Sequence, residues 1–327
     1  MAVMSSLIAA VDRPGRAARA AAAHFRRPAE RAAGQAGRVP PQVSFAEARA
    51  AGLPPVTVAY ERQGVGEPLV LLHGLGHTRQ AWHSVLPLLM DGHDAIALDL
   101  PGFGLSPDLD PVIPREPGTA VSLLGAFFRE WGMDRPHVVG HSLGGLIALR
   151  LGQAGLVRSV TALAPAGFWT GAERRYAYAV LTAARHGVRM LPEGALAGIA
   201  RSTARRAASS GTPYDRSDDC SEDTAVAAFR AMADSTAFTA TLRAGRERGL
   251  FAGDIPGVPV TVAWGTHDCL LPPWQAARVK AMIPGARIVP LPRCGHVPMD
   301  EDPVLVAELI REATGLCRCD GTAVSPA

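Results

Sequence analysis

The pattern of apolar and polar positions along this chain changes at about residue 54. From there, short apolar runs of strand length alternate with longer segments whose apolar residues recur at helical spacing. This alternation predicts a mainly parallel central sheet with helices on both faces, the α/β class. The predicted strands cover residues 56–60, 69–72, 95–98, 137–139, 160–163, 260–264 and 287–291, and the helices include 121–131 and 274–282.

One long interval lacks any strand pattern. Between residues 166 and 253 only helical spacing is found, and this length exceeds that of a single crossover helix. We therefore expect an inserted helical cap at 166–253. The predicted organisation is an alanine- and arginine-rich extension at 1–50, a core at 51–165 and 254–316, the cap, and a tail at 317–327.

Composition and charge narrow the function classes. The chain has 327 residues, 48% of them hydrophobic, which suits an enzyme-sized globule. Its formal net charge of +3 comes from the first 40 residues, which carry roughly +5, so the rest is near −2. We expect no nucleic-acid partner, because the predicted folded body is not basic. The N-terminal apolar run is a poor signal peptide and too short to cross a bilayer, so we expect no integral membrane segment.

The cysteines do not form a disulfide pattern. They are five in number and irregularly spaced, which favours free thiols and a cytoplasmic location. Cys317 and Cys319 are spaced to bind a metal or respond to an oxidant, or are simply two thiols on a tail. The sequence leaves this choice open, along with the oligomeric state. The cysteines are Cys220, Cys269, Cys294, Cys317 and Cys319.

A serine between glycines follows the predicted strand 137–139. The stretch Gly140-His141-Ser142-Leu143-Gly144 joins this strand to a segment of helical spacing. A sharp strand-to-helix turn forces strained backbone angles on its central residue, and flanking glycines avoid steric collisions there. The helix that follows directs backbone N–H groups at the same place. We interpret Ser142 as a nucleophile.

A serine nucleophile needs a base, and the base needs an acid that fixes its tautomer. His296 follows the last predicted strand, and Asp268 follows the strand 260–264. Both therefore lie at the same sheet edge as Ser142. Asp99, at the end of an earlier strand, is the alternative acid, and His73 is the alternative histidine.

Five separated motifs occur along the chain: His73-Gly74-Leu75-Gly76, Leu98-Asp99-Leu100-Pro101-Gly102-Phe103-Gly104, the serine turn, Trp264-Gly265-Thr266-His267-Asp268 and Gly295-His296. Together they resemble the motifs of capped α/β-hydrolase-fold enzymes. In that family the first motif contributes to the oxyanion hole, so the resemblance implies backbone donors at Leu75 and Leu143. It also implies catalysis without a cofactor. We expect no metal: the histidine pairs His73/His77 and His137/His141 are spaced like zinc ligands, but neither has the glutamate of an H-E-x-x-H site.

Relatives with aspartate at the turn act on halides or epoxides, whereas Ser142 indicates acyl transfer. We expect a serine hydrolase that acts on a small-molecule ester, thioester or lactone with a mostly apolar acyl group. Lyase, cyclase, acyltransferase and carbon–carbon hydrolase chemistry remain alternatives. Phe168, Trp169 and Met299 are the candidate pocket residues, because they adjoin the cap and the predicted base.

Overall fold

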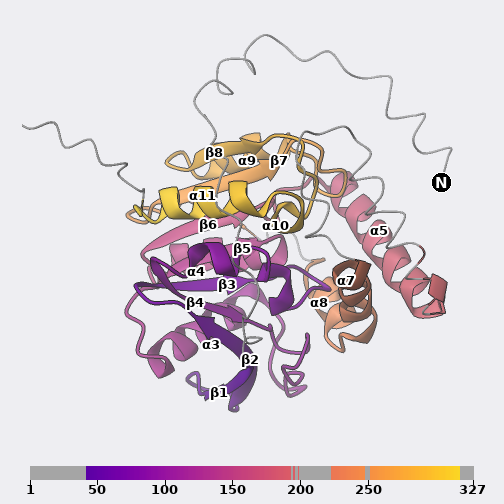
Figure 1. Ribbon diagram of the computed structural model, residues 1–327, viewed down its shortest axis with the longest axis horizontal. Coiled ribbons are helices and arrows are strands. Elements are labelled where there is room, and N and C mark those ends of the chain that lie inside the picture. The colour runs from indigo at the N-terminus through magenta and orange to yellow at the C-terminus, as the bar shows by residue number, and fades with distance from the viewer. Residues whose placement is uncertain (1–41, 193, 196–197, 199–221, 247–250, 317–327) are drawn as a thin grey trace, which may run out of the picture. The chain divides into compact units, whose positions relative to one another are not determined.

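The computed structural model describes residues 42–192, 194–195, 198, 222–246 and 251–316. Within them, one sheet has the strand order β1-β2-β4-β3-β5-β6-β7-β8, which runs from the bottom to the top of Figure 1. β2 is antiparallel to both β1 and β4, and the strands from β3 to β8 are parallel to their neighbours. The mainly parallel sheet predicted from the sequence is thus confirmed. The strands are β1 Ser44–Ala48, β2 Val56–Gln63, β3 Glu67–Leu72, β4 His93–Leu98, β5 His137–His141, β6 Ser159–Leu163, β7 Val260–Gly265 and β8 Arg287–Leu291.

Helices cover both faces of this sheet. Because side chains alternate along a strand, Leu72 of β3 packs in the apolar cluster shared with α3, α4 and α9, whereas Leu71 packs in the cluster shared with α2 and α11. Both leucines are fully buried, as expected for a strand covered on both faces. These helices and the short η3 are η3 Arg79–Trp82, α2 Leu86–Leu89, α3 Pro117–Glu130, α4 Leu143–Gln153, α9 Gln275–Met282, α10 Pro298–Glu301 and α11 Pro303–Ala313.

Strand β1 lies within the segment that the sequence analysis assigned to the extension 1–50. Its residues pair with β2, so at least 44–48 belong to the sheet. The five-residue pattern SFAEA is short and leaves Phe45 exposed, which explains why no strand was predicted there. Residues 1–41 and the tail 317–327, with Cys317 and Cys319, lie outside the described residues, as does Cys220.

Between β6 and β7, the part of the chain that is described forms three helices, α5 Gly171–Met190, α7 Glu222–Asp234 and α8 Phe238–Ala244. The cap boundaries at 166 and 253 stay a prediction. Helix α5 begins at a capping box in which Thr170 and Glu173 exchange hydrogen bonds. The Ala237 N–H donates to the carbonyl of Gly102 beyond β4, which ties α8 to the carboxyl edge of the sheet. None of the described helices is long and apolar enough to span a bilayer.

Candidate active site

Ser142 occupies a strained turn between β5 and α4. Its backbone angles are φ 52° and ψ −109°, a region that residues other than glycine rarely adopt. Three backbone hydrogen bonds hold this conformation: the Ser142 N–H donates to Leu163, and its carbonyl accepts from Leu146 and Ala166. The turn is therefore fixed by β6 and α4, and Ser142 stands at the N-terminus of a helix.

The two glycines of the serine turn are required for different reasons. A Cβ on Gly140 would overlap the backbone of Gly144, across the turn itself. A Cβ on Gly144 would instead overlap the backbone carbonyl of Leu72, on the neighbouring strand β3. The second glycine therefore permits α4 to approach β3, a long-range contact that the motif alone does not reveal.

His296 and Asp268 form a hydrogen-bonded pair at the carboxyl edge of the sheet. The distance from His296 Nδ1 to Asp268 Oδ2 is 2.8 Å, and the Asp268 side chain is fully buried. The other carboxylate oxygen, Oδ1, accepts backbone N–H groups from Leu270 and Leu271 at 2.9 and 2.8 Å. The carboxylate is thus fixed in place and occupies Nδ1 of the imidazole, which leaves Nε2 for another partner.

His141 connects the serine turn to the loop that carries His296. Its Nε2 donates to the backbone carbonyl of His296 at 2.7 Å, and the two rings lie 4.8 Å apart. His296 is thereby held against the residue that precedes Ser142. Among the described residues, no hydrogen bond reaches the Ser142 hydroxyl. Such bonds are often long before substrate binds.

Burial keeps the neighbouring histidines neutral. Burial, with the nearby charge of His296, lowers the pKa of His141 well below its ordinary value. Burial likewise lowers the pKa of His77 to about 4. Both rings are therefore uncharged at neutral pH. Among the described residues, no three or more His, Cys, Asp or Glu side chains are arranged to hold a metal ion.

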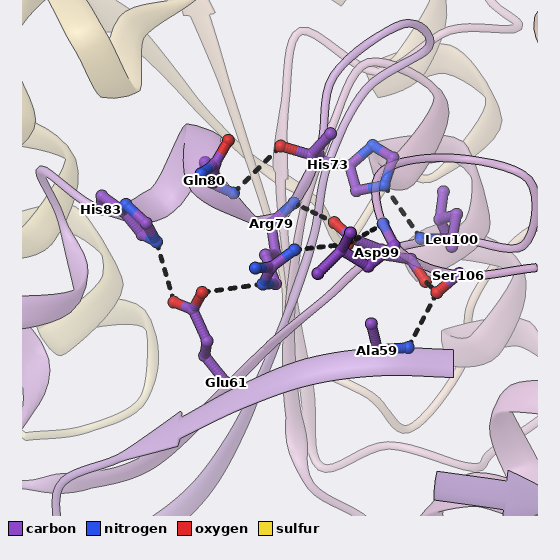
Figure 2. A network of polar contacts seen from close by, with 11 residues as sticks. Ala59, Glu61, His73, Arg79, Gln80, His83, Asp99, Leu100 and Ser106 are labelled. Carbon is purple, nitrogen blue, oxygen red and sulfur yellow. Dashed lines mark hydrogen bonds and ion pairs between the residues drawn. The ribbon is translucent and has the colours of Figure 1, made fainter. Parts of the chain in front are cut away.

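Asp99, the alternative acid of the sequence analysis, lies in a buried network with Arg79 and Glu61 (Figure 2). Asp99 Oδ1 accepts the Arg79 backbone N–H at 2.7 Å, and Oδ2 accepts both Arg79 Nη1 and the Leu105 N–H. Arg79 Nε donates to Glu61 at 2.7 Å. Because these bonds use both oxygens of Asp99, this carboxylate joins the segment 73–79 to the segment 99–105.

The Glu61 carboxylate completes this network. Burial by itself raises the pKa of Glu61, but hydrogen bonds and positive charge from His83 and Arg79 outweigh it, and the pKa is lowered. Glu61 is therefore ionised and balances the guanidinium together with Asp99. Arg79 and Glu61 were not predicted from the sequence, because each is an ordinary charged residue in its local sequence.

His73 also joins the segment 73–79 to the segment 99–105 through its hydrogen bonds. Its Nε2 accepts the Leu100 N–H at 2.9 Å (Figure 2). Nδ1 therefore carries the proton and donates to the Gly74 carbonyl at 2.8 Å. Burial lowers the pKa of His73, which keeps the ring neutral. Both ring nitrogens are used within the loops, so His73 braces the segment that contains Leu75.

A largely apolar cavity of about 150 Å³ adjoins Ser142. Leu75 and Leu143 line it together with Ser142, and both are candidate oxyanion donors. Leu143 is the first residue of α4, where backbone N–H groups have no partner within the helix. The cavity also contacts residues of β2, β4, α3, α5 and α8.

The three predicted pocket residues have different locations. Trp169 lines the cavity and packs edge-on against Tyr178, with ring centroids 5.8 Å apart. Phe168 and Met299 are not among the residues that line this cavity, and their role as pocket residues stays a prediction. Phe168 packs against Phe251 in the core, and Met299 is buried in the cluster on the opposite sheet face.

The chain matches a model of the alpha/beta hydrolase family over residues 69–309. A protein from Cupriavidus necator is named as the dihydrolipoyllysine-residue acetyltransferase component of an acetoin cleaving system. It is 30% identical to this chain over 261 residues, which cover 74% of this chain and 62% of that protein. A pimeloyl-(acyl-carrier protein) methyl ester esterase from Aeromonas hydrophila is 38% identical over 96 residues, 29% of this chain and 36% of that protein. The chain thus spans less than two thirds of the length of either relative.

Solved structures share the fold. An esterase from Thermogutta terrifontis superposes with a TM-score of 0.62 at 22% identity, covering 82% of this chain and 97% of that one. A meta-cleavage product hydrolase from Pseudomonas fluorescens also superposes with a TM-score of 0.62, at 20% identity. The superposition covers 83% of this chain and 97% of that one. At this level of identity the likeness concerns the fold.

Proposed function

The chain belongs to the alpha/beta hydrolase family, and we propose that it is a serine hydrolase of esters, thioesters or lactones with a mostly apolar acyl group. The observation that carries the proposal is the strained Ser142 turn in the wall of an apolar cavity. The hydrogen-bonded His296–Asp268 pair at the same sheet edge supports it.

In the proposed mechanism, Ser142 attacks the substrate carbonyl while His296 Nε2 accepts its proton. Asp268, held on Nδ1, fixes the tautomer and stabilises the imidazolium. Backbone N–H groups of Leu75 and Leu143 stabilise the oxyanion by several kcal/mol. His296 then protonates the leaving group, and a water molecule, deprotonated by His296, releases the acid from the acyl-enzyme.

Two relatives bear on the substrate class. The Aeromonas hydrophila protein is named as a methyl ester esterase, which supports ester chemistry. The Cupriavidus necator protein is named as an acetyltransferase component, so acyl transfer to an acceptor other than water is the second candidate. Product analysis with and without an added alcohol distinguishes the two, because only a transferase forms the new ester in preference to the acid.

The proposal is tested with p-nitrophenyl esters and an alkyl fluorophosphonate. Wild-type protein should hydrolyse the esters and gain one phosphonyl group on Ser142, detected by mass spectrometry after digestion. Ser142→Ala should abolish both, while Ser122→Ala, an exposed serine on α3, should change neither. Ester hydrolysis that persists in Ser142→Ala would show that Ser142 is not the nucleophile.

A further inference from the structure

The cavity beside the serine turn has a polar region at the start of α3. Arg115, Glu116 and Thr119 line the cavity there, next to apolar side chains of the same helix. Two further hydroxyl groups in the lining, those of Tyr178 and Thr241, belong to α5 and α8. The cavity that adjoins the proposed nucleophile is therefore mostly apolar, with a few polar groups at defined places.

Thr119 has a buried hydroxyl that no other described residue satisfies. The residue is 8% exposed and lines the cavity. Within the described part of the chain, nothing donates a hydrogen bond to this hydroxyl or accepts one from it. A buried hydroxyl is unfavourable without a partner, so any hydrogen bond that it gains is stabilising. A ligand oxygen that reaches Thr119 therefore binds better than one that meets only apolar side chains.

The N-terminus of α3 adds backbone donors to this region. The helix begins at Pro117, and its N-cap residue Glu116 makes no capping hydrogen bond through its side chain. The first N–H groups of an α-helix have no acceptor within the helix, and the helix dipole places partial positive charge there. Thr119 is the third residue of α3, so its hydroxyl lies in the same turn as these N–H groups. Both kinds of donor bind an oxygen acceptor.

Arg115 contributes a guanidinium whose charge is already balanced. Its side chain is 18% exposed, and Nη2 donates to Asp108 Oδ1. The same oxygen of Asp108 accepts the Leu109 N–H at 2.8 Å, which holds the carboxylate in place. Nε and Nη1 of Arg115 have no partner among the described residues, so they can donate to a ligand in the cavity.

The charges around this region favour an uncharged group over an anion. Asp108 neutralises Arg115, and Glu116 adds a second carboxylate to the lining. A substrate carboxylate at this place meets two negative charges and one positive charge, which is unfavourable. A keto, hydroxyl or amide oxygen accepts the same hydrogen bonds without this repulsion.

We propose that the start of α3 is a polar subsite of the cavity, in which Thr119 and Arg115 bind an uncharged oxygen of the acyl group. The subsite rests on the proposed hydrolase function and refines its substrate class. The preferred substrate is a mostly apolar ester whose acyl group carries one keto, hydroxyl or amide oxygen away from the scissile carbonyl. Thr119 and Arg115 select this substrate and take no part in the chemistry at Ser142.

A keto group moved along the acyl chain locates the subsite. We measure kcat/KM for p-nitrophenyl esters of keto acids of one length, with the keto group at successive carbons away from the ester. At most positions the keto group should lower kcat/KM relative to the unsubstituted ester, because its oxygen is desolvated without a hydrogen bond. The position that reaches Thr119 should exceed the other keto positions about tenfold. A series without a preferred position would contradict the subsite.

Substitutions assign the preference to individual side chains. Thr119→Val keeps the shape of the side chain and removes the hydroxyl, so the advantage of the preferred keto position should fall about fivefold. Arg115→Met should reduce the same ratio, with folding checked by thermal melts. Thr241→Val is the matched control, because it removes a hydroxyl from the same lining on α8 and should leave the ratio unchanged. A ratio that falls with Thr241→Val and not with Thr119→Val would overturn the inference.

A substrate with a carboxylate tests the preference for an uncharged oxygen. The half-ester of a dicarboxylic acid whose chain ends at the preferred position should react at least about tenfold more slowly than the keto ester. Glu116→Gln removes one of the two negative charges and should narrow this difference. A half-ester that reacts as fast as the keto ester would contradict the proposal.

A binding experiment separates the subsite from the proposed function. Calorimetry of Ser142→Ala with methyl esters of the same keto acids measures binding without turnover. One keto position should bind more tightly than the others, and this preference should fall about fivefold when Thr119→Val is added. Such a preference with no ester turnover by wild-type protein would support the subsite and refute the hydrolase. Turnover without any keto preference in binding would support the hydrolase and refute the subsite.

Discussion

His296 Nδ1 lies 2.8 Å from Asp268 Oδ2, a contact that joins the loop after β7 to the loop after β8. Both residues of the pair are held by further hydrogen bonds. Asp268 accepts the Leu270 and Leu271 N–H groups, and the His296 carbonyl accepts His141 Nε2. The imidazole is thus held in one orientation, as the proposed general-base role of His296 requires.

Replacement of Asp268, the acid of the proposed mechanism, should strongly lower kcat. Asp268→Asn presents an amide to His296 Nδ1 and favours the wrong tautomer, so kcat for p-nitrophenyl esters should fall roughly 10⁴-fold. Asp99→Asn is the comparison, because Asp99 was the alternative acid and contacts Arg79. Its kcat, normalised to folded protein by circular dichroism, should fall much less. The reverse order would make Asp99 the acid.

The His141 hydrogen bond should affect kcat more than KM. His141→Leu removes the donor that holds the His296 carbonyl, and a displaced base lowers kcat by up to about 100-fold. His141→Gln retains a donor of similar reach and should recover most of the loss. Steady-state kinetics of both variants, with thermal melts as controls, provide the measurement. Equal losses in the two variants would argue against a positioning role.

Arg79 should be a major contributor to stability. Arg79→Met leaves the buried carboxylates of Glu61 and Asp99 without their cation, which should reduce the free energy of unfolding by about 3–5 kcal/mol. The control is Arg62→Met, which breaks the more exposed Arg62–Asp94 pair and should cost less than about 1 kcal/mol. Urea denaturation measures both. Similar losses would show that the buried network is not strongly stabilising.

Gly104 should tolerate alanine less well than another glycine with positive φ. Gly104 has φ +54°, and an added Cβ would overlap the Asp99 carboxylate. Gly132 has φ +67° and no atom within 4 Å of its added Cβ. Gly132→Ala should therefore cost only the backbone strain, about 1–2 kcal/mol, and Gly104→Ala distinctly more. Equal unfolding free energies for the two variants would exclude a steric effect at Asp99.

Glu173 should stabilise the start of α5 in a pH-dependent way. Burial raises its pKa, but hydrogen bonds from Thr170, Arg278 and Trp274 outweigh this and lower the pKa to about 2. A depressed folded-state pKa gives stability that is present above the ordinary pKa of 4.5 and is lost as the pH falls towards 2.

The melting temperature of Glu173→Gln should therefore be lower than that of the wild type at pH 7, and the difference should shrink between pH 4.5 and pH 2. Arg278→Met removes one of the donors, so the same substitution in that background should have a smaller effect. A difference that does not change with pH would show that ionisation of Glu173 does not contribute.

The sequence by itself determined seven of the eight described strands and the position of the serine turn. The predicted strands agree with β2 to β8 because each contains its own short apolar run, even in β8, where only Leu291 is buried. Gly140 is likewise dictated locally, since the strained turn leaves no room for a Cβ there, whereas Gly144 is required by the approach of α4 to β3. Chain order also placed Asp268 and His296 at one edge, because parallel strands end together.

Only the tertiary structure decided what lies around that edge. Leu123 and Phe127 have the sequence pattern of core residues, and so does Phe168, yet the first two line the cavity and the third does not. Arg79, Glu61 and Asp99 are separated by 18 and 20 residues in the chain and become a network when η3 packs beside β2 and β4. Local sequence specifies which residues are apolar or charged, whereas cavities and ion pairs depend on how distant elements pack, and this is set by the whole fold.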